Sequence, residues 1–488
     1  MMKQLTFIYT VILLLFCSPA FSQPFTLQVS IKNQPGNPVV LGNISGDKFT
    51  PLDTLEIQQV TSGRQVKEFS WQFPVNASPG MYRLVFGQTT YAKVMDEPPQ
   101  QLNFIFNKED VVFETNFKAP QDSLKVLRSD ENSVWFNFLQ KEQLLNEELE
   151  LLEKEVDYYQ DKITAAKSFS PAETNLAELE QQASQKANAF NQLQMERDRF
   201  IEKTVNDNPG LFASRLIQTF REPLRDGYLT EEERREAFQH EFFRYVDFSD
   251  EALINSPVLT NKVFDYLVSY NRPGYSHGQR EAAYIKAVDK IMVHLQGANE
   301  KVAEFILNYL VDGFEGLRME KVLNHISENY SGNICPADEK TNLERKLEYR
   351  KMNPGTFVPD FTLNDIKGNP VTLSHVLEKR NLILFWAGWC PHCVELLPRI
   401  KTWFRQFDPN NFEVIAVSFD TSETEWKEAV KATGFEEFYN LSDLKMWDGK
   451  VAEDYNVYAT PTMFLIDENR KILARPETFE ELLKLSNR

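Results

Sequence analysis

Apolar and polar residues alternate strictly in several short runs between Phe25 and Lys118. Segments rich in Gly, Pro, Asn and Asp, which favour turns, separate these runs. The alternating apolar positions are Phe25, Leu27, Val29 and Ile31, then Phe69, Trp71 and Phe73, then Tyr82, Leu84 and Phe86, and then Leu102, Phe104 and Phe106. Because successive side chains of a strand point to opposite faces, each run predicts a strand with one buried face. These short strands predict an N-terminal antiparallel β-sandwich over residues 23–118.

Apolar residues beyond this region recur at steps of three and four. The first such series comprises Leu145, Leu149, Leu152, Val156, Tyr159 and Ile163. It predicts a helix that packs against another helix. A second helix is expected to begin at Ser170-Pro171-Ala172-Glu173, where Ser and Glu form a capping box and Pro takes the first helical position. The two helices predict an antiparallel hairpin within an all-α helical middle region, residues 119–350.

Strand and helix patterns alternate in the last segment, residues 351–488. The apolar runs Leu382–Ala387 and Phe412–Phe419 predict buried strands, and a helical pattern follows each of them. A further strand, Thr462–Ile466, turns back into Lys471–Leu473. This alternation predicts a C-terminal domain with a mixed α/β sheet.

Length and charge limit the classes of protein that fit. A chain of 488 residues has room for several domains. Its 71 Asp and Glu against 53 Lys and Arg give a net charge of -18, which argues against nucleic acid as a partner.

The N-terminus has the pattern of a targeting segment. Lys3 precedes the apolar run Phe7–Phe16, and small residues in Ala20-Phe21-Ser22 suit a signal peptidase. We therefore expect a signal peptide, residues 1–22, and a mature protein in the periplasm or cell envelope. A bulky residue before Cys17 argues against a lipoprotein anchor there. The run is too short to span a bilayer, and no later run is long enough, so we do not expect a transmembrane protein.

Two cysteines lie two residues apart in Trp389-Cys390-Pro391-His392-Cys393. The preceding strand and the following helical pattern place Cys390 at a strand-to-helix junction, near the positive end of the helix dipole. A thiol there ionises more easily, and the thiolate is the form that attacks disulfides. Cys393, one helical turn further on, is close enough to displace the resulting mixed disulfide. The motif predicts thiol–disulfide exchange through a redox-active Cys390–Cys393 disulfide.

The remaining cysteine, Cys335, has no partner once the signal peptide is removed, so a structural disulfide scaffold is excluded. We favour a buried or idle thiol at this position over an additional redox or dimer-forming cysteine. A zinc site needs four ligands, and a single Cys-x-x-Cys motif supplies only two, so we expect no metal.

The last quarter of the chain resembles the thioredoxin superfamily, in particular its exported TlpA/ResA-like branch. The resemblance rests on Pro359-Asp360-Phe361-Thr362-Leu363, on Phe385–Cys393, on Pro398 and on Thr460-Pro461-Thr462. It implies a thioredoxin-like fold in which the peptide bond before Pro461 is cis and this proline faces the cysteine pair. We expect Pro461 and Thr460 to present the substrate backbone, Pro391 and His392 to tune the reduction potential, and Trp389 to shield the site.

Two departures from related patterns are informative. Thioredoxins carry a buried acid where this chain has Leu384, so the proton acceptor for Cys393 must lie elsewhere, with Glu395, Asp420 and water as candidates. A peroxiredoxin shares the Pro-Asp-Phe-Thr-Leu opening but has Pro seven residues and Thr or Ser three residues before its reactive cysteine. Ile383 and Ala387 occupy those positions here, which argues against peroxidase activity.

The arrangement of all three regions also resembles a group of Gram-negative bacterial envelope proteins. The sequence therefore predicts an exported thiol–disulfide oxidoreductase that exchanges disulfides with protein substrates and needs no cofactor. Electrons pass to or from another dithiol protein, which we expect to be membrane-bound. The motif leaves the direction of electron flow open. The alternative is a non-enzymatic envelope binding protein that carries a passenger thioredoxin-like domain.

Overall fold

The structure is a computed structural model of the chain, and it describes residues 24–35, 38–55, 58–60, 66–169, 175–331 and 340–486. The predicted signal peptide with Cys17, the capping box at residues 170–173 and Cys335 lie outside the described residues. The chain forms two compact units, which are Met1–Val246 with Ala252–Leu259 and Asp247–Glu251 with Thr260–Arg488. The predicted domain limits at residues 118 and 350 stay a prediction.

The N-terminal region of the first unit consists of two β-sheets. Its elements are β1 (Thr26–Lys32), β2 (Val39–Ser45), β3 (Lys48–Leu55), β4 (Gln58–Val60), β5 (Val66–Gln72), β6 (Gly80–Phe86), the short helix α1 (Thr90–Val94), β7 (Gln101–Phe106), β8 (Val111–Asn116) and β9 (Lys125–Arg128). One sheet has the order β4-β5-β1-β8-β9 and the other β3-β2-β6-β7. Each alternating run of the sequence lies in or beside one of these strands, as its period of two predicts.

The two sheets share one hydrophobic core, which contains Leu27 of β1, Leu84 of β6 and Phe104 of β7. The prediction of a wholly antiparallel arrangement is wrong at one pair, because β1 and β8 run parallel. Parallel strands need a long crossover connection, and here the chain between β1 and β8 builds all four strands of the other sheet. Periodicity predicts each strand but not its partner. The β-sandwich itself therefore stays a prediction.

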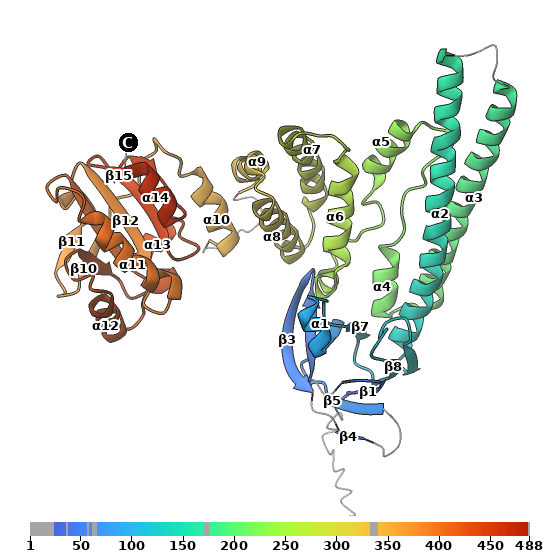
Figure 1. The fold of residues 1–488 in the computed structure, drawn as a ribbon, viewed down its shortest axis with the longest axis horizontal. Coiled ribbons are helices and arrows are strands. Elements are labelled where there is room, and N and C mark those ends of the chain that lie inside the picture. Colours follow the sequence, from blue (N-terminus) through green and yellow to red (C-terminus); the bar gives the residue numbers. More distant parts are fainter. Residues whose placement is uncertain are drawn as a thin grey trace, which may run out of the picture. The chain divides into compact units, whose positions relative to one another are not determined.

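Helices complete the first unit (Figure 1). They are α2 (Asp130–Phe169), α3 (Leu176–Asp207), α4 (Phe212–Gln218) and α5 (Glu231–Glu241). The predicted apolar seam is confirmed, since Leu145, Leu149 and Val156 of α2 share a core with Phe190 and Leu193 of α3. The two long helices lie side by side as the expected hairpin (Figure 1).

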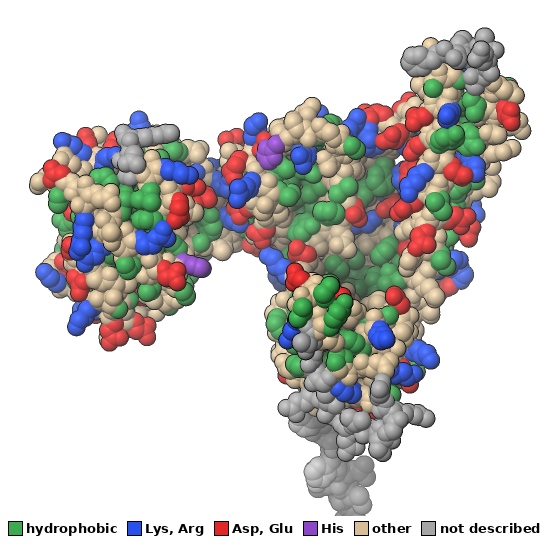
Figure 2. Space-filling view, in the orientation of Figure 1, with side chains coloured by type: hydrophobic (Ala, Val, Ile, Leu, Met, Phe, Trp, Pro, Cys, Tyr) green, Lys and Arg blue, Asp and Glu red, His purple; other side chains and the backbone are tan. Residues whose placement is uncertain are grey.

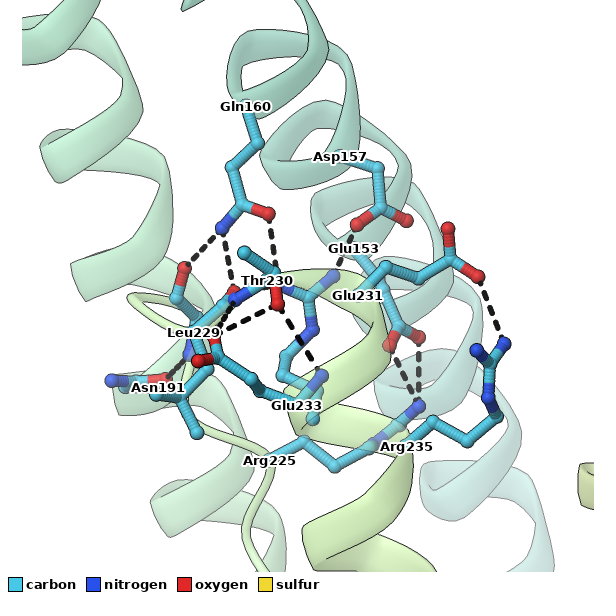
Figure 3. A network of polar contacts seen from close by, with 12 residues as sticks. Glu153, Asp157, Gln160, Asn191, Arg225, Leu229, Thr230, Glu231, Glu233 and Arg235 are labelled. Carbon is cyan, nitrogen blue, oxygen red and sulfur yellow. Dashed lines mark hydrogen bonds and ion pairs between the residues drawn. The ribbon is translucent and has the colours of Figure 1, made fainter. Parts of the chain in front are cut away.

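Polar contacts tie the segment before α5 to the helical hairpin (Figure 3). Arg225 binds both carboxylate oxygens of Glu153 on α2 at 2.8 Å. The side-chain amide of Gln160, also on α2, donates to backbone carbonyls that precede α5. Helix α5 begins with a capping box formed by Thr230 and Glu233, as its sequence predicts. These bonds satisfy polar groups at a helix start that would otherwise need water.

The helical part of the second unit precedes the C-terminal domain. It comprises η1 (Glu251–Asn255), α6 (Val258–Tyr270), α7 (His277–Leu295), α8 (Glu300–Gly316), α9 (Glu320–Tyr330) and α10 (Asn342–Lys351), of which η1 and the start of α6 are shared with the first unit. Over the described ranges, none of the helices has both the length and the apolarity required to cross a membrane. Figure 2 shows Lys and Arg scattered among Asp and Glu on the face turned to the reader.

The C-terminal domain is a seven-stranded sheet with helices. Its elements are β10 (Thr362–Asp365), β11 (Pro370–Thr372), η2 (Leu373–His375), β12 (Arg380–Trp386), α11 (Pro391–Phe404), β13 (Phe412–Ser418), α12 (Glu423–Thr433), β14 (Tyr439–Ser442), η3 (Met446–Asp448), α13 (Lys450–Asp454), β15 (Thr462–Asp467), β16 (Ile472–Ala474) and α14 (Phe479–Ser486). The strand order is β11-β10-β14-β13-β12-β15-β16.

This sheet is mixed, as the sequence predicts. Strand β12 runs parallel to β13 and antiparallel to β15, so the predicted strands lie next to one another. Residues Asn381–Trp386 of β12 are buried, because the side chains of this strand share one core with residues of α11, α12 and α14. Strand β14, which has four residues and pairs with β13 and β10, was not predicted from the sequence. The central position of β12 places its carboxyl end, and the cysteines that follow it, in the middle of the domain.

Candidate redox site

Cys390 lies at the junction between β12 and α11, where the sequence predicts it. It is the N-cap residue of α11, with an extended backbone, and Pro391 takes the first helical position. The helix begins directly at Pro391, because a proline at this position loses no intrahelical hydrogen bond. The N–H of Cys393 points at the Cys390 sulfur over 3.3 Å. A sulfur in this position receives a hydrogen bond from the positive end of the helix.

The two cysteine sulfurs are in contact. Both residues are free thiols, and the Cys393 thiol donates to the Cys390 sulfur over 2.6 Å. Cys390 is 5% exposed and Cys393 is fully buried, so an incoming disulfide can reach only the first of them. The pairing of Cys390 with Cys393 as a disulfide stays a prediction, and the contact brings the sulfurs together for it.

Burial changes the acidity of the inner thiol. Desolvation, and after it the hydrogen bond with Cys390, raises the pKa of Cys393 to about 12. Hydrogen bonds to its sulfur from the backbone of Ala387 and the side chain of Thr460 act in the opposite direction. Cys393 therefore keeps its proton at neutral pH. Of the two sulfurs, only that of Cys390 is placed to act as the first nucleophile.

A second segment, 70 residues further along the chain, meets the cysteines. The Cys390 thiol donates to the carbonyl oxygen of Thr460 over 3.5 Å, and the Thr460–Pro461 peptide bond is cis. The Thr460 carbonyl thus contacts the Cys390 sulfur, while the Thr460 side chain lowers the pKa of Cys393. The role of Thr460 and Pro461 in holding substrate stays a prediction.

The other predicted residues of the motif lie at the surface. Trp389 is 50% exposed, and Pro391 and His392 are exposed on the first turn of α11. Their roles in shielding the site and tuning its potential stay predictions. Within the ranges that the structure describes, no three His, Cys, Asp or Glu side chains are grouped to hold a metal ion.

The two acids considered as proton acceptors differ in their surroundings. Glu395 is exposed, whereas Asp420 is buried, with only 2% of its surface exposed. Both carboxylate oxygens of Asp420 accept from the backbone N–H of Gly388 at 3.0 Å, and one of them also accepts from the Ser418 hydroxyl at 2.8 Å. Sequence reasoning missed this anchor of the loop before Cys390. The available signal was the position of Asp420 just beyond a buried strand, at the edge where parallel strands end.

Known proteins are similar to this part of the chain. Residues 354–475 match the AhpC/TSA family. The thiol-disulfide oxidoreductase ResA of Bacillus thuringiensis subsp. konkukian (strain 97-27) is 28% identical over 142 residues, which are 28% of this chain and 79% of that protein. The thioredoxin-like protein YneN of Bacillus subtilis (strain 168) is 32% identical over 118 residues, which are 24% of this chain and 67% of that protein. The chain belongs to the thioredoxin-like thiol–disulfide oxidoreductases.

This assignment confirms the family indicated by the Cys-Pro-His-Cys motif and its flanking segments. Among solved structures, a thiol-disulfide oxidoreductase from Bacteroides fragilis NCTC 9343 is 26% identical, with a TM-score of 0.26, and the match covers 27% of this chain and 98% of that one. The residues of the family match, 354–475, lie in the C-terminal domain. The two named relatives support the enzyme class, so the protein is a thiol–disulfide oxidoreductase, joined to a β-sheet region and a helical region.

Proposed function

We propose that this protein is an exported thiol–disulfide oxidoreductase that exchanges disulfides with protein substrates through Cys390 and Cys393. The observation that carries the proposal is the contact between the two thiols at the start of α11, with Thr460 beside them. Only the outer sulfur can meet a substrate, while the inner one keeps its proton. This division of labour suits a two-step exchange.

In the reducing direction, the Cys390 thiolate attacks one sulfur of a substrate disulfide. A mixed disulfide forms, the substrate S–S bond breaks, and the first substrate thiolate leaves and takes up a proton. Cys393 then loses its proton and attacks the Cys390 sulfur, which forms the Cys390–Cys393 disulfide and releases the second substrate thiolate. Two electrons and two protons reach the substrate. A dithiol protein, which we propose to be membrane-bound, restores the reduced pair, and the reverse sequence oxidises a dithiol.

The segment at Pro461 offers a place for the substrate backbone. Proline has no N–H, so Pro461 donates no backbone hydrogen bond to a neighbouring segment of the protein at the site. An extended segment of substrate can pair with such an exposed edge, as in other cases of strand addition. The contact of Thr460 with Cys390 then places a docked substrate next to the attacking sulfur.

Resolution of the mixed disulfide is expected to accelerate with pH. Burial raises the pKa of Cys393 to about 12 in the reduced pair, so this thiol is almost entirely protonated at pH 7. Below that pKa the thiolate fraction rises about tenfold for each pH unit, so the resolving rate rises with it. Stopped-flow reaction of the reduced protein with an aromatic disulfide measures this rate as the second release of aromatic thiol. A flat rate between pH 6 and 9 would show that a neighbouring base removes the proton.

The N-terminal segment supports export, since its charge, apolar run and small residues fit a signal peptide cleaved after Ser22. We propose a location in the periplasm or cell envelope, with a β-sandwich and the helical region available to dock partners. Expression in a Gram-negative host followed by fractionation should give a protein that begins at Gln23 in the periplasmic fraction. An uncleaved protein in the cytosolic fraction would contradict export without affecting the redox chemistry.

Measuring the reduction potential of the Cys390/Cys393 pair against glutathione tests the activity itself. A value of about -270 mV, as in thioredoxin, would identify the protein as a reductant, and a value of about -120 mV, as in DsbA, would identify it as an oxidant. The same preparation should reduce insulin with dithiothreitol as electron source. A pair that never forms a disulfide in glutathione buffers, together with no insulin reduction, would refute the proposal.

One observation favours the binding-protein alternative. A cavity of about 860 Å³ runs along α2 in the first unit, and Phe136, Glu147 and Phe220 are among the residues that line it. A cavity of this size can hold a ligand. If the redox domain were a passenger, a variant with both cysteines replaced by Ser would keep its physiological activity, and deletion of residues 23–350 would remove it. The intact thiol pair favours catalysis.

A further inference from the structure

A buried carboxylate holds the peptide unit that leads into Cys390. Asp420 follows the last strand residues of β13, and both of its oxygens lie 3.0 Å from the Gly388 nitrogen. Its other donor is the hydroxyl of Ser418, and that hydroxyl in turn accepts from the backbone N–H of Asp420. Burying a carboxylate is costly when no cation compensates it, and hydrogen bonds to an ionised acceptor are strong. The Gly388 N–H is thus held firmly.

The same peptide unit is bound at its other end. The N–H of Gly388 and the carbonyl of Ala387 belong to one planar trans peptide, so they point in opposite directions. The Ala387 carbonyl accepts from the backbone N–H of Cys390 over 3.2 Å. Asp420 and Cys390 are therefore linked through a single rigid group. A rotation of that group would move the backbone of the nucleophile.

The space around Gly388 leaves the loop little freedom. A Cβ atom added to Gly388 would lie 2.7 Å from the Cβ of Ala429 on α12 and 3.3 Å from a carboxylate oxygen of Asp420. Glycine is needed here because two other parts of the domain approach its backbone closely. Asp420 on one side and Ala429 on the other fix the loop between β12 and α11.

We propose that Asp420 is a positioning residue that orients the Cys390 backbone through the Ala387–Gly388 peptide. This inference rests on the proposed function. The hydrogen bonds of Asp420 go to Gly388 and Ser418 and not to a cysteine sulfur. These bonds occupy both of its carboxylate oxygens. Its task is to hold the Cys390 sulfur at the helix start, where the Cys393 N–H meets it. A carboxylate used this way supports the nucleophile without exchanging protons with it.

The test compares Asp420→Ala with Asp420→Asn in the full chain. Asparagine keeps an acceptor for Gly388, and its amide can donate to the Ser418 hydroxyl, which accepts as readily as it donates. We expect Asp420→Ala to slow both alkylation of Cys390 by iodoacetamide at pH 7 and insulin reduction about 30-fold. Asp420→Asn should stay within about fivefold of the original chain in both measurements.

Asp365→Ala is the matched control. Asp365 also accepts backbone N–H groups, those of Lys367 and Asn369, but in the turn between β10 and β11. Its loss should leave alkylation of Cys390 unchanged. If Asp420→Ala does not fold, as judged from its thermal unfolding, Gly388→Ala displaces the same peptide by a different route and should give the same loss of Cys390 reactivity.

The outcomes separate cleanly. Wild-type rates in Asp420→Ala, or in a Gly388→Ala variant that stands in for it, would overturn the inference. Equal losses in Asp420→Asn and Asp420→Ala would also overturn it, because the charge or proton of the carboxylate would then matter rather than its acceptor geometry. Failure of the original chain to reduce insulin would instead refute the proposed function, and the alkylation rates of Cys390 would still decide the role of Asp420.

Discussion

Replacing Cys390 by Ser is expected to lower the rate of insulin-disulfide reduction to the rate seen without enzyme. A serine hydroxyl is not ionised near neutral pH and does not attack disulfides, whereas a thiolate does. The remaining sulfur, Cys393, cannot take over, because it is fully buried and burial raises its pKa to about 12. The loss should therefore be complete rather than partial.

The measurement is insulin turbidity with dithiothreitol as electron source, and the folded state of the variant is checked by thermal unfolding. Cys335→Ser is the matched control, since we predict an idle thiol at that position, and it should behave like the original chain. Turnover by a folded Cys390→Ser variant at the original rate would end the catalytic assignment of Cys390.

Replacing Cys393 by Ser is expected to trap substrates as stable mixed disulfides on Cys390. The first attack needs only Cys390, which keeps its place as the N-cap of α11. The second attack requires a sulfur, and Cys393 is in contact with Cys390 at 2.6 Å. Serine at this position cannot break the mixed disulfide, so the intermediate should persist until a reductant is added.

This trapping can be followed on non-reducing gels or by mass spectrometry after reaction with a model disulfide protein. The adduct should disappear on treatment with dithiothreitol, and it should be absent from a variant in which both cysteines are Ser. A Cys393→Ser variant that turns over substrate without accumulating an adduct would assign the resolving step to another thiol. The adducts recovered from cells would also identify client proteins.

Much of the fold could be predicted from local patterns. The alternating runs gave strands of the N-terminal sheets, and the apolar series from Leu145 onward gave α2 and its partner α3. Both are periodicities of neighbouring residues, so no knowledge of distant contacts was needed. Strand β14 could not be predicted, because it is short and its apolar positions show little periodicity. The parallel pairing of β1 with β8 could not be predicted either, because the partner of a strand depends on the path of the chain between the two strands.

The site shows the same division. The place of Cys390 between strand and helix followed from the order of residues, and so did the apolar surroundings of Leu384, which is fully buried. The contact of the Thr460 carbonyl with the Cys390 sulfur and the bond from Gly388 to Asp420 join residues far apart in the chain. Their geometry depends on the register of β12 against β13 and β15, which periodicity does not specify.

The order of residues is enough to assign the kind of chemistry, because two cysteines one helical turn apart after a buried strand already define a nucleophile and its resolving partner. The packing of distant segments sets which thiol stays protonated, which backbone lies against the Cys390 sulfur and which acid anchors the loop. The reason is physical. Local periodicity follows from the geometry of one strand or helix, whereas burial and hydrogen bonding at the site arise only when separate strands bring their ends together.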